Sequence, residues 1–197
     1  MFRRLGLLLE LSQYDSIGRR YFVVNGFDGA LTILGILLGF HQANDTAVSV
    51  ILSACLGAAI ALGISGISSA YISESAERKK ELKELESAMV SSLDESAHAM
   101  AAQLSPAIIA LINGLSPLLL SLIIISPLLF ALYGNPDSMI FVYFSPVEIS
   151  IFVALVVIFF LGIFLGRISG QFWLLSGLRT LLIALVTGAI ILLLIPQ

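Results

Sequence analysis

The chain is short of charge, cysteine and histidine, and each shortage excludes a class of protein. Charged residues make up 12% of its 197 positions, against 58% hydrophobic ones. A soluble domain of this size has too much polar surface to cover for such a composition. The single cysteine, Cys55, excludes a disulfide framework, and its position inside an apolar run is typical of a small buried hydrophobe.

Long apolar runs are abundant. A helix needs about 20 predominantly apolar residues to cross the hydrocarbon core of a bilayer. The sequence has five runs of about that length or longer, at residues 21–40, 46–72, 106–133, 146–166 and 172–195. We therefore predict an all-α integral membrane protein with five transmembrane helices, the first two within residues 21–72 and the last three within residues 106–197.

Two further segments flank or interrupt these runs. Residues 1–20 interleave apolar and basic side chains, which predicts an amphipathic helix in the lipid headgroups, with a frayed tail as the alternative; no cleavable signal peptide is evident. Residues 73–105 are charged and lack Gly and Pro, so we expect the second span to continue as a helix beyond the membrane. Ser92 and Glu95 have the spacing of a capping box, which predicts a second helix returning to the membrane at Pro106. Residues 73–105 would then form an acidic helical hairpin in the cytosol.

The basic residues predict an orientation. All ten Lys and Arg side chains would lie on one side of the membrane: Arg3, Arg4, Arg19, Arg20, Arg78, Lys79, Lys80, Lys83, Arg167 and Arg179. Cytoplasmic loops carry the excess of Lys and Arg in membrane proteins. We therefore expect a cytosolic N-terminus and an external C-terminus.

Asp28 is the residue most indicative of function, because it lies inside the first apolar run. A carboxylate within a membrane is costly, so such residues normally face the bundle interior and mark an ion pathway. At 100° per residue, Asp28 shares a helical stripe with Asn25, Thr32, Gly35 and Gly39. An amide, a carboxylate and a hydroxyl on one stripe predict a path for a hydrated cation; the alternative is an aspartate that braces a neighbouring helix.

A second group of acids lies on the helix that follows the second span. Carboxylates are hard oxygen ligands, which suit Mg²⁺, Ca²⁺, Mn²⁺ or Fe²⁺ better than soft metals. The alternative is an ordinary solvated helix with the ion pairs Glu74–Arg78 and Lys80–Glu84. The candidate metal-binding residues of this face, spaced so that they share one side of a helix, are Glu74, Glu77, Glu81 and Glu84.

The first span resembles the first-helix signature of the vacuolar iron transporter family. Residues 20–35 read Arg-Tyr-Phe-Val-Val-Asn-Gly-Phe-Asp-Gly-Ala-Leu-Thr-Ile-Leu-Gly, and residues 70–73, Ala-Tyr-Ile-Ser, are similar to a second family element. The resemblance implies a homodimer that exports Fe²⁺ or Mn²⁺ from the cytosol by proton exchange. It identifies Asp28 as the pathway carboxylate and the hairpin glutamates as a metal-collecting site. The chain departs from the family at Gly66 and Ala70, where a Met and a Glu are usual, which indicates a divergent, prokaryote-like member in a cell membrane.

These observations predict a divalent metal transporter. Burial disfavours the charged form of Asp28 and a bound metal ion favours it, so metal and proton would exchange there. Asn25 and Thr32 would add neutral oxygens, and Ser65, Ser69 and Ser73 would extend the path towards Glu77. The expected partners are the metal ion, protons, lipid and a second copy of the chain, with no resident cofactor and no nucleic acid. The alternative is a non-transporting metal sensor or a scaffold whose hairpin binds a partner.

An enzyme is not expected. Gly63-Ile-Ser65-Gly66 matches the serine motif of rhomboid-type intramembrane proteases, but such a serine needs a base within hydrogen-bond reach. The two histidines, His41 and His98, fall outside the apolar runs. Lipid phosphotransferases need several membrane aspartates, and the runs contain only Asp28.

Overall fold

The computed structural model is all-helical in the residues that it describes, 14–43, 46–93, 96–134 and 143–194, and those ranges contain no strand. Five of its helices are long and apolar enough to cross a membrane, so the chain is an integral membrane protein. They are α2 (Tyr14–Gln42), α3 (Val48–Met89), α4 (Ala97–Tyr133), α6 (Pro146–Ile168) and α7 (Trp173–Leu194).

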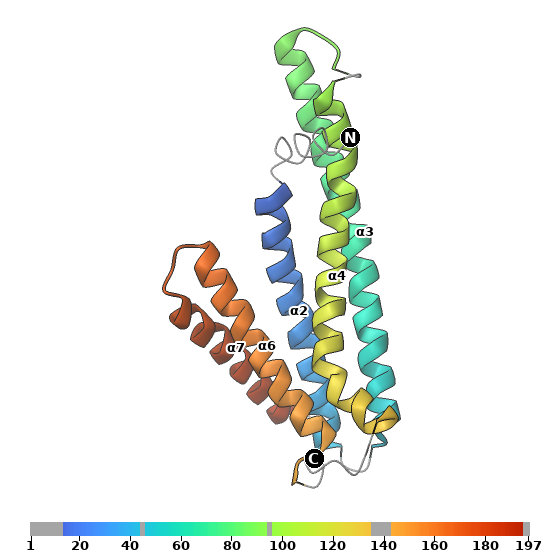
Figure 1. Cartoon of the computed structure of the whole chain (residues 1–197), viewed down its shortest axis with the longest axis vertical. Coiled ribbons are helices and arrows are strands. Elements are labelled where there is room, and N and C mark those ends of the chain that lie inside the picture. The colour runs from blue at the N-terminus through green and yellow to red at the C-terminus, as the bar shows by residue number, and fades with distance from the viewer. Residues whose placement is uncertain (1–13, 44–45, 94–95, 135–142, 195–197) are drawn as a thin grey trace.

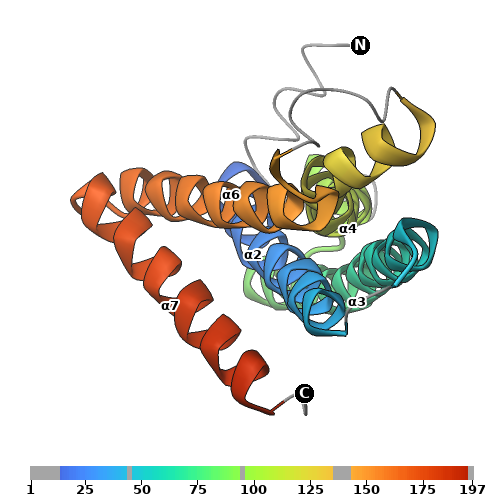
Figure 2. The ribbon, with the colours of Figure 1, turned by 90° about the horizontal axis from the view of Figure 1, so that it is seen from below.

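The helices form two connected layers. The antiparallel pair α3 and α4 extends beyond the other helices at the upper end of Figure 1, and α2 lies alongside α4. The second pair, α6 and α7, leans against α2, as the view from below in Figure 2 also shows. The start of α2, the α3–α4 turn and the α6–α7 connection are the upper ends of their helices in Figure 1, with the α3–α4 turn highest and the α6–α7 connection near mid-height. The α2–α3 turn and the end of α7 lie at the other end.

The core lies where α2, α3, α4, α6 and α7 meet. Its fully buried side chains include Ile33 and Leu37 of α2, Ile124 and Ile125 of α4, and Ile158 of α6. Most other apolar side chains point outward, as a membrane protein requires, since lipid is as apolar as these side chains.

Glycines allow close approach within each antiparallel pair. A Cβ on Gly114 of α4 would collide with the backbone of Gly63 and Ile67 in α3, and a Cβ on Gly166 of α6 would lie 2.7 Å from the Cβ of Ser176 in α7. Such small residues let helix backbones pack tightly where the hydrophobic effect gives no help. Gly114 and Gly166 are therefore positions where the helix backbones of each pair pack closely.

The second span and the outward arm of the hairpin form one continuous helix, α3, of 42 residues. The returning arm belongs to α4. The prediction that α4 begins at a capping box on Ser92 was wrong. The N-cap is Ser96, whose hydroxyl accepts a hydrogen bond from the backbone N–H of Ala99, while Leu93 donates its backbone N–H to Glu86 and so belongs to the turn.

The predicted boundaries before the first span, at residue 21, and before the third span, at residue 106, both fall inside continuous helices. Pro106 lies inside α4, so the returning arm and the third span are one helix. Residues 14–20 belong to α2 together with the first span. The amphipathic helix predicted at the N-terminus falls mainly on residues 1–13, outside the described part of the chain.

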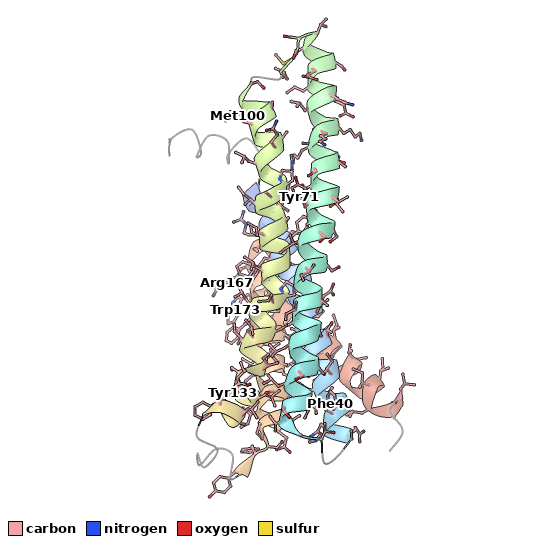
Figure 3. All side chains as sticks on the ribbon, turned by 90° about the vertical axis from the view of Figure 1, so that its right-hand side faces the viewer. Phe40, Tyr71, Met100, Tyr133, Arg167 and Trp173 are labelled. Carbon is pink, nitrogen blue, oxygen red and sulfur yellow. The ribbon has the colours of Figure 1, made fainter. Side chains whose placement is uncertain are left out.

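Exposed tyrosines mark two levels of the bundle. Tyr133 and Phe40 lie at its lower end in Figure 3, and Tyr71 lies well above them on α3. Tyr71 and Tyr133 are 51% and 78% exposed. Arg167 and Trp173, on either side of the α6–α7 connection, lie between these two levels.

Candidate functional site

Asp28 lies on the outer side of α2. The buried side of this helix carries Ala30, Ile33 and Leu37, which pack into the core. Asp28 and Thr32 are exposed on the opposite side, and the Thr32 hydroxyl donates a 2.7 Å hydrogen bond to the backbone carbonyl of Asp28. The expectation that Asp28 faces the interior of its own bundle was therefore wrong: within one chain, the interior side of α2 is filled by aliphatic side chains and by close helix contacts.

A groove of about 250 Å³ opens beside Asp28, between α2, α6 and α7. Its walls are almost entirely apolar, and Asp28 and Thr180 are its polar lining residues. The Thr180 hydroxyl already hydrogen-bonds to the carbonyls of Gly177 and Ile158, at 2.9 and 3.2 Å. None of the ion pairs between described residues includes Asp28. The groove thus offers one carboxylate in apolar surroundings.

Asn25 turns from Asp28 towards α4. Its side-chain amide donates to the side-chain oxygen of Asn113, which is 97% buried, and also to the carbonyl of Tyr21 at 3.4 Å. Asn113 donates in turn to the carbonyl of Gly66 at 2.7 Å. This amide cluster joins α2, α3 and α4. Sequence reasoning did not assign Asn113, although the repeated Asn-Gly dipeptides of the first and third spans were a signal for it.

The hairpin glutamates do not converge on one point. Glu74 is 8% exposed and accepts a 3.0 Å hydrogen bond from the Tyr21 hydroxyl. Arg78 pairs with Glu74 at 3.7 Å and with Glu81 at 2.7 Å. Lys80 lies 3.9 Å from Glu84, and Glu77 is exposed. The described part of the chain contains no group of three acidic, His or Cys side chains that could hold a metal ion.

The predicted serine path lies on α3, away from the groove. Ser65, Ser69 and Ser73 are exposed, and the hydroxyls of Ser69 and Ser73 hydrogen-bond to carbonyls of their own helix, those of Gly66 and Ala70. None of these serines lines the groove beside Asp28. The structure brings Asp28 and Thr32 together on one face and leaves the serines on another helix.

The two departures from the iron transporter pattern are both buried. A Cβ on Gly66 would lie 3.1 Å from the Cα of Gly114, so a methionine there would push α3 and α4 apart. Ala70 is 2% exposed on the same side of α3. The close α3–α4 contact and the Asn113 hydrogen bond take the space that larger side chains would occupy.

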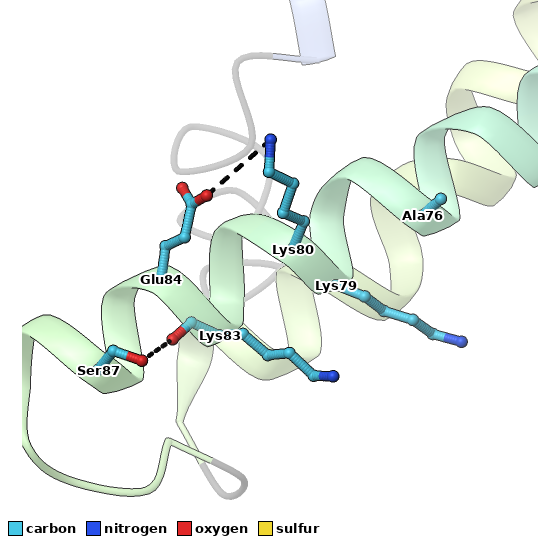
Figure 4. Close-up of a pocket in the computed structure, with 6 residues that line it drawn as sticks. All are labelled: Ala76, Lys79, Lys80, Lys83, Glu84 and Ser87. Carbon is cyan, nitrogen blue, oxygen red and sulfur yellow. Dashed lines mark hydrogen bonds and ion pairs between the residues drawn. The ribbon is translucent and has the colours of Figure 1, made fainter.

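A lysine-rich surface lies on the extension of α3 (Figure 4). Lys79, Lys80 and Lys83 project from this stretch, and Lys80 pairs with Glu84. The Ser87 hydroxyl donates to the carbonyl of Lys83 at 2.8 Å. The surface is open, and Glu84 lies on it together with the lysines.

The comparisons with known proteins identify one relative. The chain is 28% identical over 165 residues to an uncharacterized protein of the archaeon Methanocaldococcus jannaschii, and the match covers 82% of this chain and 80% of that protein. No family model matches the chain, and no solved structure matches it. The similarity to the vacuolar iron transporters therefore rests on the motifs around Asp28 and Tyr71 and stays a prediction.

Proposed function

We propose that this protein moves a divalent metal ion, Fe²⁺ or Mn²⁺, out of the cytosol in exchange for protons, with Asp28 as the coupling carboxylate. The observation that carries the proposal is the position of Asp28 in a candidate membrane-spanning helix, exposed on α2 and outside the ion pairs of the described residues. A carboxylate in the membrane is costly to retain without a function. Fe²⁺ or Mn²⁺ is proposed as the transported ion because residues 20–35 resemble the first-helix signature of metal exporters.

The exposed side of α2 supports the proposed homodimer. Val24, Asp28 and Thr32 follow one another at four-residue spacing and all are exposed. In a bilayer this stripe would place a carboxylate against lipid, at a cost on the order of several kcal/mol. A second copy packed against the stripe through a two-fold axis would bring two Asp28 side chains to a shared, lipid-free path.

The groups beside Asp28 fit a metal–proton exchange. A metal ion favours the ionised carboxylate, so its arrival releases a proton, and its departure lets a proton return. The Thr32 hydroxyl donates to a carbonyl, which leaves its oxygen lone pairs for a cation. Asn25 turns towards α4 and donates to Asn113 and Tyr21, so it holds α2 in place rather than adding a ligand beside Asp28.

The proposed orientation places the α3–α4 hairpin in the cytosol. Arg20 lies near the start of α2 and the lysines lie on the extension of α3, while Arg167 and Arg179 flank the α6–α7 connection. By chain order these segments are all on the side from which α2 enters the bundle. The exposed Glu77, Glu81 and Glu84 would then meet cytosolic metal first. With lysines nearby and Arg78 already bound, their affinity for a divalent cation would be low.

The second candidate function is a metal sensor or a scaffold that transports nothing. The ion pairs Glu74–Arg78 and Lys80–Glu84 favour it, because they account for much of the hairpin charge without a metal. A scaffold has no use for Asp28, which separates the two candidates.

Manganese uptake into proteoliposomes that contain the purified protein and an internal Mn²⁺-quenched dye tests the proposal. We expect uptake by the wild type, loss of uptake in Asp28→Asn, and uptake close to wild type in Ser126→Ala, an exposed serine of α4 remote from the groove lining. Equal quenching in protein-containing and protein-free vesicles would favour the sensor or scaffold instead.

A further inference from the structure

The groove beside Asp28 has a buried floor and an open mouth. Val23 and Leu161 form part of its floor and are 4% and 6% exposed, whereas Leu165 and Ile183 on its rim are 42% and 47% exposed. These residues belong to the candidate spans α2, α6 and α7, so the mouth opens on the flank of the bundle and not at its end. A ligand can therefore enter sideways from the membrane.

The lining is poorly matched to a hydrated metal ion. Mg²⁺-like and Ca²⁺-like ions take six or more oxygen ligands or keep their waters. Only Asp28 and Thr180 among the lining residues carry side-chain oxygens, and the Thr180 hydroxyl is already engaged with two carbonyls. A metal ion in this groove would lose hydration that the walls cannot replace.

The same lining is matched to a cation that carries its own apolar shell. Ligand sites are typically apolar concavities with a few polar groups that fix orientation. A carboxylate in apolar surroundings favours a partner of opposite charge, and Phe27 on the groove wall adds an aromatic ring that attracts cations. An uncharged lipid chain would fill the apolar walls but would leave Asp28 without a counter-charge.

We propose that this groove binds a weakly hydrated organic monocation, such as a quaternary ammonium or phosphonium ion or an amphiphilic amine, which enters from the bilayer and places its charge against Asp28. The inference goes beyond the proposed metal transport and does not need it, because binding can be measured where no flux occurs. If both hold, the organic cation and the metal ion compete for one carboxylate, and the organic cation inhibits metal flux.

Tetraphenylphosphonium and tetraphenylborate are the probes, because they share size and shape and differ in the sign of their charge. Equilibrium dialysis of each labelled ion against the purified full-length protein in uncharged detergent measures binding. We expect saturable binding of the phosphonium ion alone, with one of its phenyl arms in the groove. Affinity should fall at least tenfold in Asp28→Asn, which keeps the shape of the side chain and removes its charge.

Two substitutions on α7 keep the test independent of Asp28. Ile183→Trp narrows the mouth of the groove and should also reduce phosphonium binding at least tenfold. Ile190→Trp, at a residue of similar exposure on the same helix but outside the groove lining, should bind like the wild type. Phosphonium binding that is absent in the wild type, unchanged in Asp28→Asn and Ile183→Trp, or matched by tetraphenylborate would overturn the inference.

Discussion

The side-chain amide of Asn25 in α2 donates to the side-chain oxygen of Asn113 in α4, and Asn113 continues the chain of hydrogen bonds to the Gly66 carbonyl of α3. Three helices are thus joined by one buried amide pair a turn away from Asp28. In a membrane, such interhelical hydrogen bonds replace the hydrophobic attraction that holds soluble helices together. The amide pair therefore fixes the rotation of α2 that turns Asp28 outward.

Replacement of Asn113 should weaken the bundle. Asn113→Leu removes two interhelical hydrogen bonds and leaves the Gly66 carbonyl without its side-chain donor, so we expect a loss of about 1–2 kcal/mol in unfolding free energy. Unfolding of the purified protein by sodium dodecyl sulfate, followed by tryptophan fluorescence, measures it. Ser126→Ala, which removes a hydroxyl bonded within its own turn of α4, is the control. Equal midpoints for the two variants would show that the amide pair contributes no net stability.

Gly114 should be intolerant of even a methyl group. A Cβ there would collide with the Gly63 carbonyl and Ile67, so Gly114→Ala must separate α3 from α4. We expect lower thermal stability and less folded protein by size-exclusion chromatography. Gly57→Ala on α3 is the matched control, since a Cβ at Gly57 meets no heavy atom within 4 Å. Parity between Gly114→Ala and Gly57→Ala would contradict the close contact.

Arg78 should suppress metal binding by the hairpin. It pairs with both Glu74 and Glu81, so a metal ion must displace it before these carboxylates can act as ligands. We predict micromolar to millimolar affinity for Mn²⁺ in the wild type and several-fold tighter binding in Arg78→Gln, measured by titration calorimetry.

Two variants control this titration. Lys83→Gln removes one positive charge from the same helix without breaking either Arg78 pair. The variant in which Glu74, Glu77, Glu81 and Glu84 are all replaced by Ala should lose the heat of binding to the hairpin. Identical heats for the wild type and this last variant would leave the solvated-helix interpretation of the glutamates standing.

The orientation is tested by chemical labelling. A cysteine added after residue 197 in a Cys55→Ser background should react with an impermeant maleimide only from the external face of the membrane, because the basic segments belong on the cytosolic face. A cysteine at Ser87, on the extension of α3, should react only from the cytosolic face. Reversed labelling of the pair would invert the proposed orientation.

Composition and periodicity were sufficient to predict the helices but not which sides of them meet. The five apolar runs match α2, α3, α4, α6 and α7 closely, because run length alone decides whether a helix can span a membrane. Helical spacing could not predict whether the Asp28 side of α2 faces the core or the outside. Asn25, Asp28 and Thr32 share one stripe by spacing, but their side chains point in different directions. Asn25 turns to α4, and the other two residues turn outward.

The sequence also left two interpretations of the charged hairpin helix. The same spacing of acids and bases fits a metal-binding face and a solvated helix, and the positions of the Arg78 and Lys80 side chains distinguish them. The contact of Glu74 with the Tyr21 hydroxyl joins residues 53 positions apart, and local spacing carries no signal for it.

Simultaneous measurement of metal and proton movement tests the role of Asp28 most directly. Purified protein is reconstituted into proteoliposomes with a Mn²⁺-quenched dye and a pH dye inside, and external Mn²⁺ is added without a pH gradient. We predict that Mn²⁺ entry alkalinises the lumen in the wild type as protons leave, that an inward-acidic gradient accelerates entry, and that Asp28→Asn, although folded, abolishes both signals. Undiminished Mn²⁺ entry and proton exit in Asp28→Asn would contradict the account.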